Sequence, residues 1–347
     1  MNALVQPLYN LAEFEEIKKQ IQKKGIINVS GCLDSQKAHF VQGFSEDFPF
    51  RLIVTQNDQK AREFYEDYKL YDPEVLFYPA RDLIFYQADL HGNLITQQRI
   101  VVLQALLERK QATVVTSVDS CLDELGPLEI WKDKILYFQN DSEIDLDQMK
   151  HLLVEMGYER TSQVEVPGQF SIRGGIMDIF PLTEPNPWRI ELWGDEIDSI
   201  RSFDVQSQRS IENLEDITIY PATEMVLDKN TIQTGLKALK KEADLLVKKL
   251  RDEFKTEEAA RVRRAAEEIR DQMGEFEHFA NAESFITYFY KKNSIFSGLF
   301  SGKYIDRTRR AKPSGRSCQT YRRGISGKYG TSSGKRIHPS GADESNM

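Results

Sequence analysis

The sequence predicts an α/β fold: a parallel-sheet domain with a degenerate P-loop-like turn, an inserted small α+β domain and a disordered basic tail. Short apolar segments alternate with amphipathic ones over the first 120 residues, which is typical of a parallel sheet covered by helices. From about Leu128 the segments lengthen and are separated by glycine-containing turns, and after about Phe300 the apolar pattern ends. At 347 residues the chain is also longer than one hydrophobic core usually organises, which favours two domains.

Residues 1–125 are predicted to form the first part of the parallel-sheet domain. Short runs rich in β-branched residues and bounded by polar segments predict buried strands at 25–29, 51–55, 75–78 and 113–116. Segments 61–70 and 97–109 between these runs predict helices. This alternation indicates a parallel sheet with both faces covered.

The octapeptide Gly31 to Ala38 follows the first predicted strand and has the length of a phosphate-binding loop, GxxxxGK[ST]. Such a loop needs a second glycine that lets the backbone curl around phosphate and a hydroxyl that binds magnesium. Gln36 and Ala38 replace these two, and only Gly31 and Lys37 fit the pattern. The octapeptide is therefore interpreted either as a non-functional relic of such a loop or as an ordinary polar connection.

Residues 126–212 are predicted to form a small α+β domain, with antiparallel strands. A strand is expected over 129–138 and a helix over 146–156, followed by strands across 163–204. The pairs Gly174-Gly175 and Gly194-Asp195 predict tight turns within that last stretch.

Residues 213–295 are predicted to return to the first domain as helix. Residues 230–273 are dense in Lys, Glu, Ala, Leu and Arg with leucines at helical spacing, which predicts one long helix or a helical pair. Residues 296–347 are predicted to be a disordered basic tail, because the segment has almost no apolar periodicity. A nucleic-acid-binding tail is one interpretation, but we favour translation past a frameshift near residues 293–303, which the other reading frames of the coding DNA would test.

The charge of the chain is unevenly distributed. Residues 301–347 carry a net charge of +8, whereas residues 1–300 carry −16. An acidic body argues against nonspecific nucleic-acid binding, because phosphate contacts need clustered positive charge, so a protein partner is expected. No apolar run is long enough to span a membrane, and the acidic N-terminal segment is unlike a signal peptide, which together predict a cytoplasmic protein. The scattered cysteines and histidines predict neither disulfides nor a metal site.

The stretch from Gln169 to Arg209 holds the candidate site. Arg173 precedes the turn at Gly174-Gly175, and alternation along the strand 189–193 places Arg189 and Trp193 on its outer face. Arginine and tryptophan are frequent energetic anchors of protein interfaces. The alternative is that Trp193 is buried under a helix of the second domain and that Arg189 only pairs with Glu191 or Asp195.

Segments 156–170, 170–181 and 189–210 closely resemble the region that UvrB shares with transcription-repair coupling factors. FDVQSQRS (203–210) and YPARDLIFYQADLHGN (78–93) are more similar to the coupling factors than to UvrB, which would also keep an intact phosphate loop. The resemblance covers residues 1 to about 290. It implies a UvrB-like domain 1a that is split in sequence by an inserted UvrA-binding domain.

In the family, UvrA contacts an arginine of the RGG-type turn and an arginine and an aromatic residue of the next strand. These positions match Arg173, Arg189 and Trp193, although the aromatic residue is commonly phenylalanine in relatives. The resemblance therefore implies a UvrA-recruiting module of transcription-coupled nucleotide excision repair that is not itself an enzyme. It also implies that RNA polymerase, double-stranded DNA, ATP and magnesium bind domains of the full-length family absent from this segment, so we expect no cofactor here.

Two alternatives stay open at the level of sequence. A UvrB-like or helicase-like NTPase would require a working phosphate loop, which Gln36 and Ala38 argue against. A DNA-binding protein acting through the basic tail would show salt-dependent affinity that is lost on deletion of residues 301–347.

Overall fold

We analysed a computed structural model of the chain. The structure describes residues 4–23, 26–81, 91–109, 111–276, 285–290 and 294–300. All of these belong to one compact unit, Met1–Thr308, and the second unit, Arg309–Met347, lies outside the described residues. The predictions for residues 301–347 therefore lie outside them as well.

The chain begins with a small helical cluster. It comprises the 3-10 helix η1 (Gln6–Asn10) and the helices α1 (Ala12–Gln22) and α2 (Asp34–Ser45), which pack through apolar side chains such as Leu8, Phe14 and Phe44. The strand predicted at 25–29 is wrong in the described part, because residues 26–30 form no strand. Ile26 and Val29 are 83% and 51% exposed, so this apolar run has no sheet to pair with.

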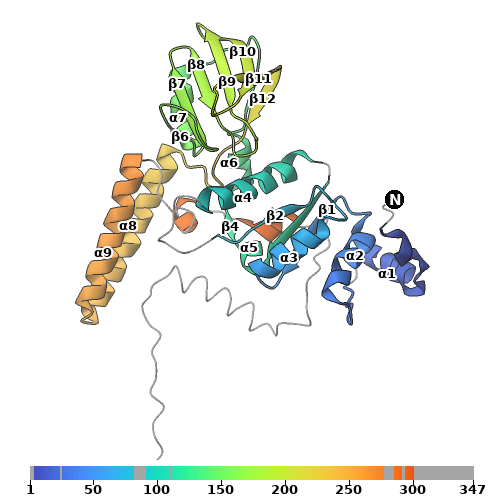
Figure 1. Ribbon diagram of the computed structural model, residues 1–347. Coiled ribbons are helices and arrows are strands. Elements are labelled where there is room, and N and C mark those ends of the chain that lie inside the picture. The colour runs from blue at the N-terminus through green and yellow to red at the C-terminus, as the bar shows by residue number, and fades with distance from the viewer. Residues whose placement is uncertain are drawn as a thin grey trace, which may run out of the picture. The chain divides into compact units, whose positions relative to one another are not determined.

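A three-stranded parallel sheet follows, as predicted. Its strands are β1 (Phe50–Thr55), β2 (Leu76–Tyr78) and β3 (Ala112–Ser117), in the order β1-β3-β2. Helices α3 (Asp58–Tyr68) and α4 (His91–Glu108) connect them, and the short α5 (Val118–Cys121) follows β3. Figure 1 shows α3 and α4 beside this sheet.

The two faces of the parallel sheet are covered by different helices. Leu52 and Val114 share a core with Ile100 of α4, whereas the adjacent residues Ile53 and Val115 belong to a second core with side chains of α2 and α3. Successive residues of a strand point to opposite faces. The prediction of a sheet covered on both sides is therefore confirmed.

The chain then leaves the parallel sheet through short elements. These are β4 (Glu124–Leu125), α6 (Leu128–Lys132), β5 (Leu136–Gln139), α7 (Leu146–Glu155) and β6 (Glu159–Arg160). The helix predicted at 146–156 is confirmed, but the strand expected over 129–138 forms only at its end, because residues 128–132 are helical. Trp131 is buried in that helix, and its indole N–H donates to the carbonyl oxygen of Thr223 at 3.0 Å.

A six-stranded sheet forms the centre of this second region (Figure 1). It comprises β6, β7 (Gln169–Arg173), β8 (Ile176–Ile179), β9 (Trp188–Trp193), β10 (Glu196–Phe203) and β11 (Ser210–Leu214), in the reverse of chain order. All neighbours are antiparallel except β6 and β7. The predicted turns are confirmed, with Gly174 and Gly194 at φ +60° and +65°, where glycine avoids a steric cost. The strand β12 (Asp216–Ile219) pairs with β5 outside this sheet.

Two long helices, α8 (Lys229–Asp252) and α9 (Thr256–Phe276), lie against each other, which settles the predicted alternatives as a helical pair (Figure 1). Asp228 caps α8 by accepting from the backbone N–H of Thr231. The elements α10 (Ile286–Phe289), β13 (Ser294–Ile295) and η3 (Phe296–Phe300) follow.

The predicted start of the disordered tail, at residue 296, is too early in the sequence. Residues 296–300 form η3, and Phe296 and Phe300 are buried. The ring of Phe296 stacks on that of Tyr78 with centroids 3.6 Å apart. These two aromatic side chains therefore belong to the core of the parallel-sheet region. The other boundaries, at 125/126 and 212/213, stay predictions.

Candidate protein-docking surface

The six-stranded sheet has one apolar and one polar face. Ile172, Met177, Ile190 and Ile200 form a cross-strand row that packs in the main core together with side chains of α7. The residues between them point to the other face, because side chains alternate along a strand and those of paired residues share a face. The candidate site lies on this second face.

Two rows of paired residues cross the polar face. The first row consists of Ser171, Asp178, Arg189 and Arg201, and the second of Arg173, Ile176, Glu191 and Ser199. The register therefore places Arg173 and Arg189 on the same face and brings Asp178 directly opposite Arg189 on the neighbouring strand.

Asp178 connects the two arginines. Its carboxylate is 1% exposed and accepts from Arg173 Nη2 at 2.7 Å, from Arg189 Nε at 2.7 Å and from Arg189 Nη2 at 2.9 Å. The pair with Arg189 is bidentate, which is the strongest geometry for an arginine and a carboxylate. A buried carboxylate requires such partners, since an unpaired charge in this position would be costly.

Arg189 is held on several sides. Besides Asp178, its Nη2 donates to Oε1 of Gln208 at 3.0 Å, and its guanidinium lies 4.5 Å from the ring centroid of Phe203. The hydrogen bonds from Arg189 to Asp178 raise the pKa of Arg189. Gln208 lies in the turn after β10 with φ +59°, and its backbone N–H donates to Asp204 at 2.8 Å. The alternative pairing of Arg189 with Glu191 or Asp195 is therefore wrong; Glu191 pairs with Arg201.

Arg173 is more accessible than Arg189. Its side chain is 50% exposed, against 18% for Arg189. It immediately precedes the turn at Gly174-Gly175, which fits closely against β9. A Cβ on Gly175 would lie 3.0 Å from the carbonyl oxygen of Leu192, so a larger residue would displace the turn. The two glycines thus fix the end of β7 from which Arg173 extends.

Trp193 lies at the end of β9 and is 86% exposed. The alternative of a buried Trp193 is therefore wrong; the buried tryptophan of this strand is Trp188, at 7%. Trp193 is four residues from Arg189, or roughly 13 Å along a strand. The structure thus gathers the two arginines around Asp178 and leaves the indole on the same face at the strand end.

Sequence analysis missed three contributors: Asp178, Phe203 and Gln208. Asp178 does carry a signal, because it is a single charge within the apolar run from Ile176 to Phe180. Its partners follow only from the register of β8 with β9. Phe203 and Gln208 were included in a resemblance motif, without a role in the site.

The phosphate-loop interpretation is not confirmed. Residues 26–33 form no strand before the octapeptide, and α2 begins at Asp34. The side chain of Gln36 accepts from the backbone N–H of Leu33 at 3.1 Å, and Lys37 pairs with Asp34. Ala38 is buried in the core beside Ile53. Gly31, at φ +82°, is explained by the turn into α2 alone.

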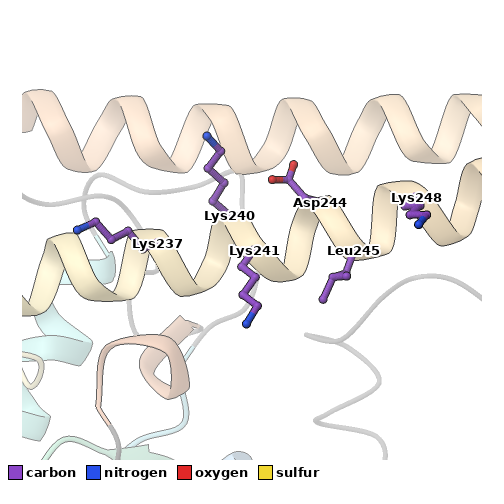
Figure 2. A pocket seen from close by; sticks show the side chains of 6 residues that line it. All are labelled: Lys237, Lys240, Lys241, Asp244, Leu245 and Lys248. Atoms are coloured by element: carbon purple, nitrogen blue, oxygen red, sulfur yellow. The ribbon is translucent and has the colours of Figure 1, made fainter.

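A second charged surface runs along α8. Figure 2 shows an open depression beside this helix that is lined by Lys237, Lys240, Lys241, Asp244, Leu245 and Lys248. Leu245 is 62% exposed, and the lysines extend as separate charges along the helix. This is the usual arrangement of a solvated helix face over an apolar stripe. Within the described residues, no three His, Cys, Asp or Glu side chains are placed to share a metal ion.

A buried ion network lies where the chain passes between its two sheet regions. Arg99 of α4 is 1% exposed, and its Nη1 donates to Asp123 at 2.8 Å and to the carbonyl oxygen of Pro79 at 2.8 Å. Its Nη2 donates to Glu224 at 3.0 Å, and Arg81 pairs with the same carboxylate. Burial raises the pKa of Glu224, but the charges of Arg81 and Arg99 outweigh this effect and bring that pKa to about 2.

Comparison with known proteins identifies a family match that contains the six-stranded sheet. Residues 136–225 match the family described as the UvrB interaction domain, which contains β5 to β12 and ends one residue after Glu224. Searching the described part of the chain finds no helix long and apolar enough to cross a membrane.

Sequence similarity to known proteins covers more of the chain than residues 136–225. A transcription-repair-coupling factor of Bacillus subtilis is 37% identical over 224 residues, which is 61% of this chain and 19% of that protein. Those of Staphylococcus haemolyticus and Staphylococcus epidermidis are 34% and 33% identical over 229 and 231 residues, or 65% and 66% of this chain. The chain spans about a fifth of the length of these relatives. Residues 136–225 thus match the UvrB interaction domain, and the chain is similar to the transcription-repair-coupling factors over about a fifth of their length.

Proposed function

We propose that the chain recruits UvrA in transcription-coupled nucleotide excision repair through the polar face of its six-stranded sheet. The observation that carries this proposal is the 86% exposure of Trp193 on the same face as Arg173, within the residues that match the UvrB interaction domain. A side chain of this size gains nothing for folding when it stays in water. Its exposure beside Arg173 on a polar face leaves it available for binding.

The chemistry of the surface favours a protein partner. Tryptophan and arginine dominate the energetics of protein interfaces, and arginine recognises carboxylates with paired hydrogen bonds. Residues 1–300 carry a net charge of −16, which disfavours the phosphate backbone of nucleic acid as the main partner of the folded part. UvrA would accordingly present an acidic group to Arg173 and an apolar pocket to Trp193.

Isothermal titration calorimetry with purified UvrA tests the proposal. Arg173→Ala, Arg189→Ala and Trp193→Ala should each weaken the complex by about 1 to 4 kcal/mol, as the removal of interface anchors does. Phe254→Ala is the matched control, because Phe254 is 93% exposed but lies at the end of α8. Unchanged affinity in all three folded variants would refute the assignment of the surface.

A role as an NTPase has less support. The residues that would bind phosphate and magnesium are replaced by Gln36 and Ala38, and Lys37 is paired with Asp34. We therefore propose that the chain does not hydrolyse ATP and needs no cofactor for binding UvrA. ATP turnover that disappears in Lys37→Ala would overturn this part of the proposal.

Nucleic acid and RNA polymerase are not proposed as partners of the six-stranded sheet. For the full-length family, the resemblance implies RNA polymerase and double-stranded DNA as further partners, and we assign neither to the surface that contains Trp193. Binding through the basic segment 301–347 is tested by deletion of those residues. Salt-dependent DNA affinity that is lost in the deletion would favour this second function.

A further inference from the structure

Asp178 is unusual among the residues of the polar face, because it is buried while most of its neighbours are accessible. Its carboxylate is 1% exposed, and both oxygens accept hydrogen bonds from arginine. Arg189 occupies Oδ1 and Oδ2 together, and Arg173 shares Oδ2. One carboxylate thus fixes the direction of both guanidiniums.

The two arginines are fixed to different degrees. Arg189 contacts Asp178, Gln208 and the ring of Phe203, and its Nε and Nη2 donors are both used in hydrogen bonds. Arg173 donates to Asp178 through Nη2 alone, at 2.7 Å, and its side chain is half exposed. Arg173 therefore keeps nitrogens that can reach an incoming group, whereas Arg189 is enclosed.

We propose that Asp178 is the positioning residue of the docking surface. It holds Arg189 as an internal support and orients Arg173. Arg173 then contacts a carboxylate of the partner, and Trp193 contacts the partner beside it. The inference rests on the proposed function. It assigns the direct contacts to Arg173 and Trp193, which lie at the same end of the sheet beside the turns at Gly174 and Gly194.

Positioning has a physical benefit for binding. An arginine that is free in solution loses side-chain entropy when a partner immobilises it, and this loss reduces affinity. Asp178 restricts Arg173 before the partner arrives. One negative charge between two positive ones also leaves the cluster with a net positive charge, which attracts an acidic group.

The alternative is that Asp178 serves only the stability of the sheet. In that case Asp178→Asn would lower the melting temperature, but it would not change how much Arg173 contributes to binding. A double-mutant cycle separates the two roles, because it measures whether the effect of one residue depends on the other.

The experiment uses the full chain and UvrA, with affinity measured by calorimetry and folding by circular dichroism. Asp178→Asn should weaken binding about tenfold, as expected for the loss of charge-assisted hydrogen bonds. Arg173→Ala should weaken binding about tenfold in the wild type but less than about threefold in the Asp178→Asn background. Asp198→Asn, an exposed carboxylate of β10, is the control for the change in charge and should leave affinity unchanged.

A comparison of Arg189→Ala with Arg173→Ala tests the inference even if Asp178→Asn does not fold. Arg189→Ala should lower both the melting temperature and the affinity, because it leaves the carboxylate of Asp178 with one partner. Arg173→Ala should lower the affinity while the melting temperature stays within about 2 °C of the wild type. Equal losses of melting temperature in these two variants would overturn the division of roles.

The remaining outcomes distinguish this inference from the proposed function. Full affinity in folded Asp178→Asn, or an equal effect of Arg173→Ala in both backgrounds, would overturn the positioning role alone, provided that Trp193→Ala still weakens binding. A wild-type chain that fails to bind UvrA would overturn both proposals.

Discussion

Two tryptophans at the ends of one strand have opposite environments. Trp188, the first residue of β9, is 7% exposed and packs in the main core, whereas Trp193, the last residue, is 86% exposed. They are five positions apart in the strand, and an odd number of positions places two side chains on opposite faces of a sheet. The same residue type therefore contributes to folding at one position and remains available for binding at the other.

This difference predicts contrasting effects on stability. Trp188→Ala should lower the free energy of unfolding by about 3 to 5 kcal/mol, as truncation of a buried aromatic residue does. Trp193→Ala should change it by less than about 0.5 kcal/mol, because little surface is removed from water there. Urea denaturation of both variants checks the prediction, and a comparable loss in Trp193→Ala would mean that the indole is buried in solution.

The candidate residues were accessible to sequence reasoning to different extents. Alternation along 189–193 was sufficient to place Arg189 and Trp193 on one face, and the glycine pair marked the turn beside Arg173. The pairing of Arg189 with Asp178 could not be predicted in the same way. It depends on which residue of the neighbouring strand lies opposite, and alternation within one strand does not determine that register.

Local sequence pattern predicted a strand or helix correctly where tertiary contacts support that element. The runs that became β1, β2 and β3 and the run at 25–29 look alike in sequence, but the described part of the last run, residues 26–29, has no sheet neighbour. A strand needs partners for its backbone groups, so an apolar run without them stays irregular. The segment 128–132 became helical for a similar reason, since Trp131 packs into the core and bonds to Thr223 from a helix.

The packing of α8 against α10 can be tested by substitution at their contact. Gly235 lies inside α8, and a Cβ there would overlap Cδ1 of the buried Phe289. Alanine normally stabilises a helix relative to glycine by about 1 kcal/mol. We predict the opposite sign for Gly235→Ala, a loss of about 1 to 3 kcal/mol, because the ring of Phe289 must move.

Thermal unfolding of Gly235→Ala measures this effect. Thr234→Ala, at the exposed neighbouring position, serves as the control and should raise stability slightly through helix propensity. If both variants gain stability, α10 does not pack against α8 as the structure has it.

Arg99 joins segments that are far apart in sequence. Asp123 precedes the matched interaction domain and Glu224 lies at its end, so one guanidinium binds the chain both where it leaves the parallel-sheet region and where it returns. No pattern in the sequence predicts this network, because its members are up to 143 residues apart. The network fixes both ends of the segment between Asp123 and Glu224 to α4.

The carboxylates of this network differ in their response to pH. Burial raises the pKa of Asp123, and the charge of Arg99 only partly opposes it. Burial also raises the pKa of Glu224, but two arginines lower it from 4.5 to about 2. Since the pKa of Glu224 is lower in the folded than in the unfolded state, ionised Glu224 stabilises the fold above about pH 4.5, and this contribution is lost as the pH falls towards 2.

Glu224→Gln should therefore destabilise the protein in a pH-dependent way. Near neutral pH the loss should be about 3 kcal/mol, because Arg81 and Arg99 keep buried charges without their shared partner. The difference in the free energy of unfolding between wild type and variant should shrink as the pH falls from 4.5 towards 2, since wild-type Glu224 becomes protonated in that window. Asp123 titrates in both proteins, so the difference reports mainly on Glu224.

Urea denaturation at a series of pH values measures this difference in the free energy of unfolding. A difference that stays constant or grows in acid would show that Glu224 is not held ionised by the two arginines.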